Sequence, residues 1–309
     1  MGWTVYRANK SQPWPGTASL EVSLLWLGHA DPAEERILDG RQVRAITPSL
    51  DAESRATGNP HRLLANAGQA FVGSYVLGMG FVLEPDQAQA LKDKDPRNAD
   101  VLFPYLNGED LNSRPDCSAR RWVIDFFDLS EEAAREYPDV FAIVEQKVKP
   151  ERQRTKPDGS YVLRKPLPHR WWQYADKRPA LREAIKGLDR VLVTTLVSKY
   201  LTPCLVEKSQ IFAHKLAVFA TDEFSQLCVM TSAHHQNWAV SYSSTLETRL
   251  NYSPSDAYET FPQPALTARM DAVGRELDTY RRSVMLERVT SRSSLLVWLF
   301  NEAVLCSLG

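Results

Sequence analysis

Hydrophobic and polar positions near the start of the chain alternate as they do in β-strands. Residues 18–27 (ASLEVSLLWL) form an apolar, partly alternating run, which predicts a long buried strand. The turn sequence PWPG at residues 13–16 separates it from residues 4–8, which predict the partner strand of a hairpin. A chain that opens on a finished hairpin is typical of the last strands of a larger sheet. The polar, turn-rich residues 31–69 then predict a connector between domains.

The middle and end of the chain alternate short strand patterns with short helix patterns. Apolar runs predict strands at residues 71–83, 101–105, 121–127, 191–197, 201–206 and 211–220. Helical spacing and start signals predict helices from Glu84-Pro85 to Lys92, from Ser130 to Lys147 with a break near Pro138, and at residues 179–185, 223–242 and 265–288. Residues 106–111 predict a turn, 149–170 a polar loop and 246–264 an irregular segment. The fold class predicted is therefore α/β, of the mixed α+β type.

Composition places the chain among soluble globular proteins and indicates one large domain or two ordinary ones. It has 309 residues, of which 43% are hydrophobic and 24% charged. The N-terminus has no apolar signal region, and the apolar run 295–300 is far shorter than a membrane span. The four cysteines lie far apart, which argues against a zinc site and a disulfide framework and favours a reducing, cytoplasmic location.

Three short patterns mimic catalytic or cofactor motifs but lack the context that the chemistry needs. Gly78-Met79-Gly80 is followed by a strand pattern instead of the helix of a nucleotide-binding loop, so a bulge or a close backbone approach is the better interpretation. Asp139 and Glu145 with Lys147 imitate a nuclease motif, but they share one helical stretch, which favours a solvated helix face. His234-His235 has no second ligand cluster at usable spacing. We therefore predict no catalytic residue and no metal or cofactor site in this chain.

Positive charge is concentrated in one segment, although the formal net charge of the chain is only −1. The segment 147–178 carries Lys147, Lys149, Arg152, Arg154, Lys156, Arg164, Lys165, His169, Arg170, Lys177 and Arg178, with Trp171, Trp172 and Tyr174 interleaved. Basic and aromatic residues on a loop are typical of a surface that follows nucleic-acid phosphates. The alternative is a solvated loop whose tryptophans turn into the core.

Residues 246–252 (LETRLNY) form a second candidate surface. If this segment is extended, Glu247, Arg249 and Asn251 share one side, because alternate residues of a strand face the same way. Glutamate can accept a hydrogen bond from cytosine N4, arginine can bind guanine with two hydrogen bonds, and asparagine can pair with adenine. A surface strand with an ordinary mixed face is the alternative.

Six short segments resemble a known family, and they occur in order between residues 3 and 288. They are PYLNGEDLNSRP at 104–115, RWVIDF at 121–126, VKPER at 148–152, RWWQY at 170–174, YSPSD at 252–256 and ETFP at 259–262. Together they resemble the MmeI-like type II restriction-modification enzymes, in which one polypeptide joins a nuclease region, a helical spacer, an N6-adenine methyltransferase domain, a target-recognition domain and a C-terminal helical part. The family's S-adenosylmethionine loop and Asn-Pro-Pro motif lie upstream of everything matched here. The pair Asn59-Pro60 continues as His61-Arg62 and departs from that motif.

The resemblance implies a domain order for this chain. Residues 1–35 correspond to the closing hairpin of a methyltransferase domain, 36–69 to a connector, 70–265 to the target-recognition domain and 266–309 to a C-terminal helix with an apolar tail. The family continues beyond the position of Arg288 into further helices, whereas this sequence reads VTSRSSLLVWLFNEAVLCSLG. A frameshift is our hypothesis for that tail, and residues 293–309 are expected to pack poorly.

The function implied is sequence-specific recognition of duplex DNA for an adenine methyltransferase or restriction enzyme, by a fragment that is inactive alone. The resemblance favours Glu247, Arg249 and Asn251 as base readers. Phosphate contacts are expected from Lys149, Arg152, Arg154, Arg164, Lys165, Arg170 and Lys199. No cofactor is expected in this chain, S-adenosylmethionine is expected in the intact enzyme, and the partners are DNA and an upstream methyltransferase domain or chain. The alternative is an inert remnant or a protein-assembly module without DNA binding of its own.

Overall fold

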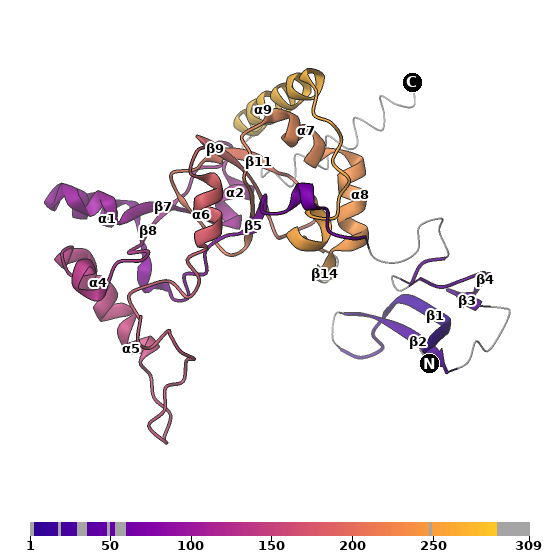
Figure 1. The fold of residues 1–309 in the computed structure, drawn as a ribbon, viewed down its shortest axis with the longest axis horizontal. Coiled ribbons are helices and arrows are strands. Elements are labelled where there is room, and N and C mark those ends of the chain that lie inside the picture. The colour runs from indigo at the N-terminus through magenta and orange to yellow at the C-terminus, as the bar shows by residue number, and fades with distance from the viewer. Residues whose placement is uncertain are drawn as a thin grey trace.

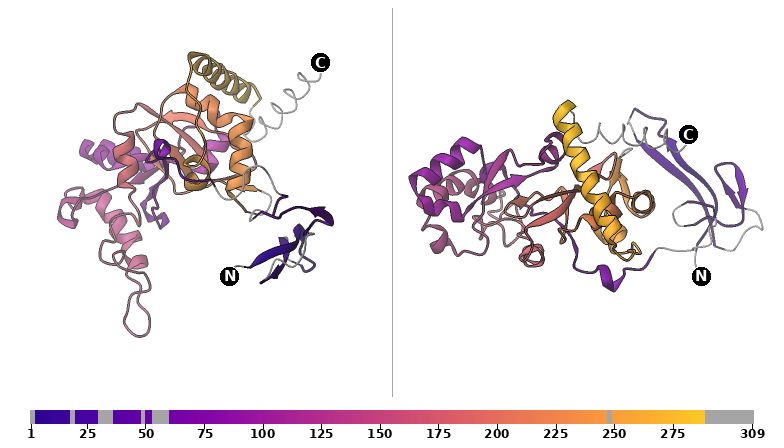
Figure 2. Two further views of the ribbon diagram at one scale, coloured as in Figure 1. Left: turned by 45° about the vertical axis from the view of Figure 1, so that its right-hand side comes forward. Right: turned by 90° about the horizontal axis from the view of Figure 1, so that it is seen from above.

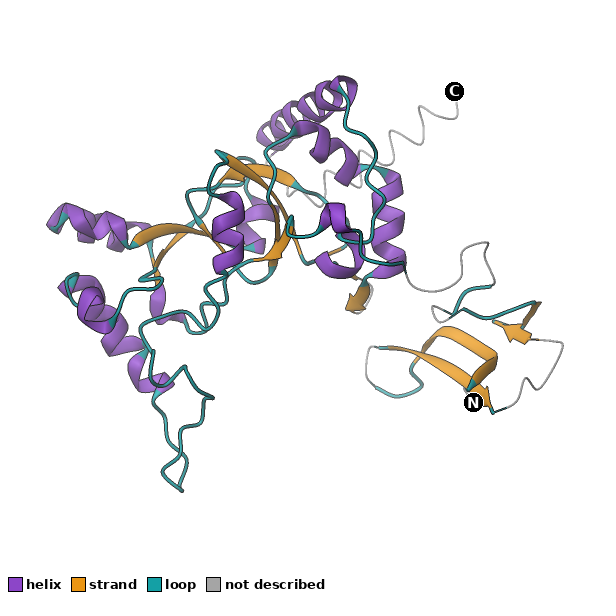
Figure 3. Cartoon of the chain, viewed as in Figure 1, coloured by secondary structure: helices purple, strands orange, loops and turns teal. Residues whose placement is uncertain are grey.

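The computed structural model describes residues 3–17, 20–29, 36–47, 50–52, 60–246 and 249–288. The strands of these residues form four sheets, with helices between and around them (Figure 1, Figure 3). The predicted mixed α/β class is therefore confirmed. Within the described residues, no helix is long and apolar enough to cross a membrane.

The N-terminal sheet lies to one side of the rest of the chain in each view (Figure 2). It contains β1 (Thr4–Pro13), β2 (Glu21–Gly28), β3 (Arg36–Leu38) and β4 (Arg41–Val43) in the order β2-β1-β3-β4. The predicted hairpin is confirmed, since β1 and β2 pair antiparallel. The expectation that the second strand is buried was wrong, since β2 is exposed or half-buried along its whole length. The segment predicted to be a connector also supplies β3 and β4.

The central sheet has both faces buried. It contains β5 (Ala70–Val72), β9 (Arg190–Thr195), β11 (Cys204–Glu207) and β13 (Leu216–Phe219), antiparallel in the order β11-β9-β13-β5. Successive apolar residues of a strand point to opposite faces. Leu192, Leu205 and Phe219 therefore join one cluster with α7 (Phe224–Thr231) and α8 (Ala233–Tyr242). Val191, Val193 and Val218 join another with α2 (Gly108–Ser113) and α6 (Pro179–Ile185).

A second sheet continues from the central one. It contains β6 (Val82–Leu83), β7 (Leu102–Leu106), β8 (Arg121–Ile124) and β12 (Ile211–Phe212) in the order β12-β7-β8-β6. The flanking helices are α1 (Pro85–Lys94), α3 (Glu131–Ala134), α4 (Pro138–Lys147) and α5 (Lys149–Arg152). Strand β12 pairs with β7, and a three-residue turn then leads from β12 into β13 of the central sheet. The two sheets are therefore joined at the turn 213–215.

The third small sheet and the last helix complete the fold. Strands β10 (Val197–Ser198), β15 (Arg249–Asn251) and β14 (Ser244–Leu246) pair in that order, followed by the π-helical turn η4 (Pro254–Tyr258). Helix α9 (Ala268–Arg288) packs on α7. Gly274 permits this contact, because a Cβ there would lie 2.0 Å from the Phe224 carbonyl oxygen.

The sequence pattern located most of these elements but misjudged some boundaries. The predicted helix 223–242 is two helices, broken at Ser232, whose hydroxyl accepts a hydrogen bond from the His235 amide at 3.3 Å. The predicted strand 211–220 is the pair β12 and β13, and the predicted turn 106–111 contains the start of α2. The close approach expected at the Gly78-Met79-Gly80 segment is confirmed, since a Cβ on Gly80 would lie 2.7 Å from Val148 Cγ2. The tail 293–309 lies outside the described residues.

Candidate nucleic-acid interface

The segment 107–110 (NGED) is a helix cap that fixes α2 against the central sheet. Asn107 Oδ1 accepts hydrogen bonds from the amides of Glu109 at 2.8 Å and Asp110 at 3.1 Å. The buried Asp110 carboxylate accepts from Asn107 Nδ2 at 2.9 Å and from the Arg120 amide at 3.1 Å. A Cβ on Gly108 would lie 3.2 Å from Thr195 Cγ2 of β9, so glycine lets the helix start close to that strand. These contacts satisfy the first amides of α2 and set its position.

Strand β15 presents alternate residues to opposite sides, as predicted. Leu250 and Tyr252 are buried at 6% and 2% exposure, whereas Arg249 is exposed and Asn251 half-buried. Asn251 Nδ2 donates to Ser244 Oγ of the neighbouring strand at 2.9 Å. Glu247, the third predicted base reader, lies outside the described residues.

A groove of about 750 Å³ brings residues of the segment 104–115 together with residues of the segment 246–252. Its lining includes Arg249 and Asn251 of β15, residues of α2, and the ends of β7 and β8. The remaining lining comes from β9, β10 and the turn 213–215. The residues that line the groove are Met79, Tyr105, Asn107, Gly108, Glu109, Asn112, Arg121, Thr195, Leu196, Val197, Ala213, His214, Lys215, Arg249 and Asn251.

The groove is rich in positive charge. Arg121, Lys215 and Arg249 line it, with Glu109 as the acidic residue among the lining side chains. Burial, followed by the charges of Lys215 and Arg178, lowers the pKa of His214 below its usual value. Burial also raises the pKa of Tyr105, which keeps its hydroxyl a neutral donor. A cationic cavity with neutral donors and acceptors suits an anionic ligand that carries polar edges.

Sequence reasoning did not select Arg121, His214 or Lys215. Residues 211–220 read as one strand, so the turn that carries His214 and Lys215 was hidden within it. Arg121 opens an ordinary strand pattern, and only the pairing of β7 with β8 brings it beside Tyr105. A sequence pattern holds no local signal for either placement, because both depend on contacts between distant segments.

The inner side of β15 is anchored by a buried histidine. Tyr252 directly follows β15, and its hydroxyl lies 3.1 Å from Nε2 of His235, which is fully buried on α8. The His235 ring also packs edge-on against Phe261 at 4.7 Å between ring centroids. Burial lowers the pKa of His235 to about 4, so the ring is neutral at physiological pH. The alternative of a core histidine, favoured over a metal ligand from the sequence, matches this placement.

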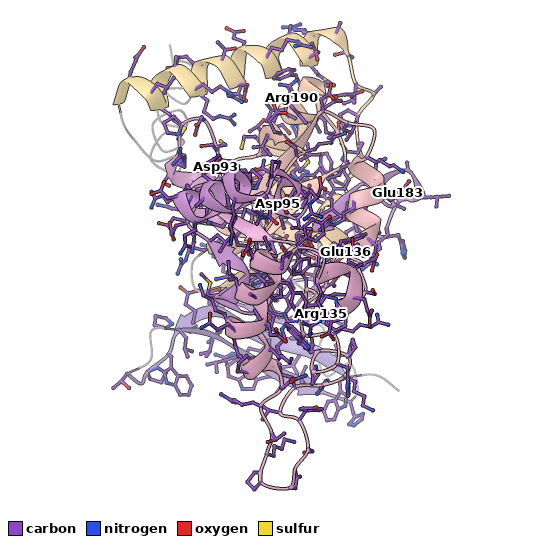
Figure 4. All side chains as sticks on the ribbon, turned by 90° about the vertical axis from the view of Figure 1, so that its left-hand side faces the viewer. Asp93, Asp95, Arg135, Glu136, Glu183 and Arg190 are labelled. Atoms are coloured by element: carbon purple, nitrogen blue, oxygen red, sulfur yellow. The ribbon has the colours of Figure 1, made fainter. Side chains whose placement is uncertain are left out.

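The basic segment becomes a loop that projects beyond α5 (Figure 4). Arg154, Arg164, Lys165 and Arg170 are exposed on this loop, residues 153–170, which we call the basic arm. Lys149 at its base donates to Glu145 at 2.8 Å, and its ammonium lies 4.9 Å from the Trp171 ring centroid. Lys199 is exposed between β10 and β11 with its ammonium 5.3 Å from the ring centroid of Tyr200.

Arg152, expected among the phosphate contacts, is instead a core residue. It is 1% exposed, and its guanidinium donates to the carbonyls of Val76 at 2.7 Å and Leu77 at 2.9 Å, and to those of Trp171 and Gln173. Burial lowers its pKa to about 10, which still leaves it charged at neutral pH. Because these hydrogen bonds engage the guanidinium, a phosphate cannot reach it. We therefore remove Arg152 from the set.

The aromatic residues near the arm are also internal. Trp171, Trp172 and Tyr174 are buried at 2%, 8% and 5% exposure, in the core of the second sheet. The indole of Trp172 donates to the Leu129 carbonyl at 3.0 Å, and the Tyr174 hydroxyl donates to the Ile124 carbonyl at 2.7 Å. The alternative in which the tryptophans turn into the core is therefore confirmed. The arm therefore exposes positive charge, while the indoles that follow it pack in the core of the second sheet.

The nuclease-like residues on α4 make outward ion pairs. Asp139 pairs with Lys94 at 2.7 Å, and Glu145 pairs with Lys149 and Arg135 at 2.8 and 3.3 Å. Each pair is partly exposed, and the two carboxylates have separate partners. The solvated helix face favoured from the sequence is therefore confirmed.

Comparison with known proteins gives a family match and a structural match. The family model described as "MmeI, target recognition domain" matches residues 57–265. The structure of the type IIL restriction-modification enzyme MmeI in complex with DNA aligns with a TM-score of 0.66 and 14% identity over 93% of this chain. The chain spans 38% of the length of that protein. The type IIG restriction endonuclease BpuSI aligns with a TM-score of 0.35 and 12% identity, over 72% of this chain and 26% of that one. No curated protein matches the sequence.

Arg152 and its neighbour on the arm provide a matched test of core and surface arginines. Arg152→Met should lower the free energy of unfolding by about 3 kcal/mol, because it leaves buried carbonyls without their charged donor. Arg154→Met, on the exposed arm, should stay within about 0.5 kcal/mol of wild type. Urea denaturation of the full chain measures both. Equal effects of the two substitutions would show that the Arg152 network contributes no stability.

The buried His235 predicts an acid-sensitive stability. Its folded pKa of about 4 lies below the value of 6.5 for an unperturbed histidine, so its contribution is complete above pH 6.5 and declines as the pH falls towards 4. Between pH 6.5 and 5 the loss should be about 2 kcal/mol. His235→Asn should remove this part of the pH dependence, while His234→Asn, at the exposed neighbour, should leave it as in wild type. Unfolding curves across that pH range decide the matter, and an unchanged slope in His235→Asn would refute the assignment.

Proposed function

The chain belongs to the family of MmeI target recognition domains, and we propose that it reads the sequence of duplex DNA for a site-specific N6-adenine methyltransferase or restriction enzyme. The observation that carries this proposal is the groove that Arg249 and Asn251, on the outward side of β15, line together with α2. A cationic cavity that presents alternate strand residues is suited to the edges of base pairs and their neighbouring phosphates.

Base reading is assigned to the outward side of β15, which we call the reading strand. The exposed Arg249 can donate two parallel hydrogen bonds to guanine, and the Asn251 amide can bind adenine. Glu247 completes the assignment as an acceptor for cytosine N4. The inward residues Leu250 and Tyr252 pack in the core, so they hold the strand in place and support the readers.

Phosphate contacts are assigned to exposed cations of the basic arm, to the half-buried Lys149 at its base, and to Lys199 between β10 and β11. The proposed set is Lys149, Arg154, Arg164, Lys165, Arg170 and Lys199. Side chains that project from a loop can approach a phosphate without losing packing contacts. Such contacts release condensed counterions, so the affinity they supply must decrease steeply with salt.

The chemistry of modification is assigned to another part of the enzyme. S-adenosylmethionine and the catalytic groups would reside in a methyltransferase domain or chain that partners this one. The N-terminal sheet is the proposed contact with that partner. Its residues Leu24, Leu25 and Leu27 are 47–49% exposed, which is unusual for neighbouring leucines on a strand. An inert remnant or a protein-assembly module remains the alternative function.

The two sets of proposed DNA contacts should respond differently to mutation. Arg249→Ala should relax the preference at one base pair by about 1–3 kcal/mol, because it removes a base contact. Arg164→Ala should weaken binding to every sequence alike and reduce the salt slope by about one unit. Selection from a randomised duplex library and titrations at several salt concentrations measure both. Binding without salt dependence would favour the assembly module, and a uniform effect of Arg249→Ala would refute its assignment as a reader.

The N-terminal sheet should bind the methyltransferase part of a family enzyme. When that part is produced as a separate chain, Leu25→Lys should reduce its co-purification with this protein at least several-fold, because burying an unpaired charge is unfavourable. Leu64→Lys provides the control, since Leu64 is 92% exposed and lies outside the sheet. Equal recovery with both variants would exclude the sheet as the docking surface.

A further inference from the structure

Helix α2 lines the same groove as β15, and two of its side chains make no hydrogen bond or ion pair with another described side chain. Within the segment NGEDLN at 107–112, Asn107 and Asp110 form the helix cap, Gly108 packs on β9, and Leu111 is fully buried. Glu109 and Asn112 remain, and both line the groove. Residues three apart on a helix share one face, so the two side chains project together.

We propose that Glu109 and Asn112 form a second base-reading surface, specific for a base that presents an exocyclic amino group in the major groove, which is adenine or cytosine rather than guanine or thymine. This inference rests on the proposed function, since it assumes that duplex DNA occupies the groove. The amino group would be adenine N6 or cytosine N4, because the carboxylate can only accept hydrogen bonds. The amide of Asn112 can accept from the same base or donate to its neighbour.

The charge of Glu109 supports a reading task. Three cations line the same groove, yet within residues 60–246 and 249–288 the Glu109 carboxylate forms no ion pair. A carboxylate beside DNA is repelled by phosphates and by the carbonyl acceptors of guanine and thymine. The same group is stabilised when it accepts from an amino group. Repulsion of the wrong bases and attraction of the right ones together give specificity.

A buried hydroxyl on the same groove is a second, independent observation. Thr195 lines the groove at 4% exposure, and its Oγ1 has no hydrogen-bond partner among the described residues. Buried hydroxyls are nearly always satisfied in folded proteins, so one that borders a cavity offers a hydrogen bond to a polar group that enters it. Thr195 lies next to Gly108, at the start of the helix that carries Glu109. A polar group that binds Thr195 and the base edge inferred from Glu109 would therefore occupy the same space.

The rigidity of α2 suits this task. The cap hydrogen bonds and the contact between Gly108 and Thr195 fix the helix start on the central sheet. Reading side chains discriminate best when the element that carries them is held by its surroundings. The segment 107–112 thus combines four residues that position the helix with two that face the ligand.

The test is selection of bound duplexes from a randomised library by the full chain and its variants. Wild type should enrich a motif with adenine or cytosine at the position read by α2. Glu109→Ala should lower that preference about tenfold, the lower part of the range for a base contact. Glu109→Lys should shift the same position towards guanine or thymine, because the lysine donates where the glutamate accepted. The matched control is Glu183→Lys on α6, at a residue labelled in Figure 4 whose side chain is 79% exposed and does not line the groove.

The outcomes separate this inference from the proposed function. If wild type enriches no motif, the proposed function fails and the inference with it. If wild type enriches a motif and Arg249→Ala alters it, while both Glu109 variants keep every preference, the function stands and the second base-reading surface is overturned. Uniform weakening by Glu109→Ala also overturns it, since that is the result of a structural role. Thermal unfolding of each variant verifies that the fold is intact.

Discussion

Burial of both faces of the central sheet is the constraint on which the rest of the described structure depends. Strands β9 and β13 are apolar on each side, so helices must cover both of their faces. Helices α7 and α8 cover one face, and α2 and α6 cover the other. The groove lies where this packing ends, at Thr195 and the turn 213–215. The side chains that face it are therefore placed by core packing, although most of them are polar and only partly buried.

The buried charge of Arg152 fixes the ends of the basic arm, as apolar packing fixes the central sheet. Arg152, which directly precedes the arm, donates to the carbonyls of residues 171 and 173, which follow it, and to those of residues 76 and 77. Apolar side chains could not satisfy four carbonyl oxygens at a point where irregular segments converge, whereas the planar guanidinium has five N–H donors. The arm can thus carry exposed arginines on irregular backbone while both of its ends remain attached to the second sheet.

Local sequence patterns predicted the helices and strands better than they predicted where individual side chains lie in the folded protein. The helix at 179–185, the proline-initiated helix α1 and the alternation of residues 249–252 all follow from rules that act within a few residues. The burial of Arg152 could not be predicted, because its partners lie 19 to 76 residues away and its basic neighbours are exposed. Lys215 lines the groove because it lies in the turn 213–215, which the apolar pattern of residues 211–220 did not predict. The exposure of β2 was not predicted for a related reason. An apolar strand pattern indicates a surface suited to burial, but it does not identify the element that would bury it.

Strand β15 belongs to a small sheet whose strands have only two or three residues. Of residues 249–252, Leu250 and Tyr252 pack in the core, whereas Arg249 and Asn251 do not. Outward positions in such a strand can change identity without disturbing the interior that supports them. Under the proposed function, single substitutions at these outward positions would change the recognition sequence and leave the protein folded. The alternation of side chains along β15 would then explain both how recognition sequences vary and why the fold stays the same.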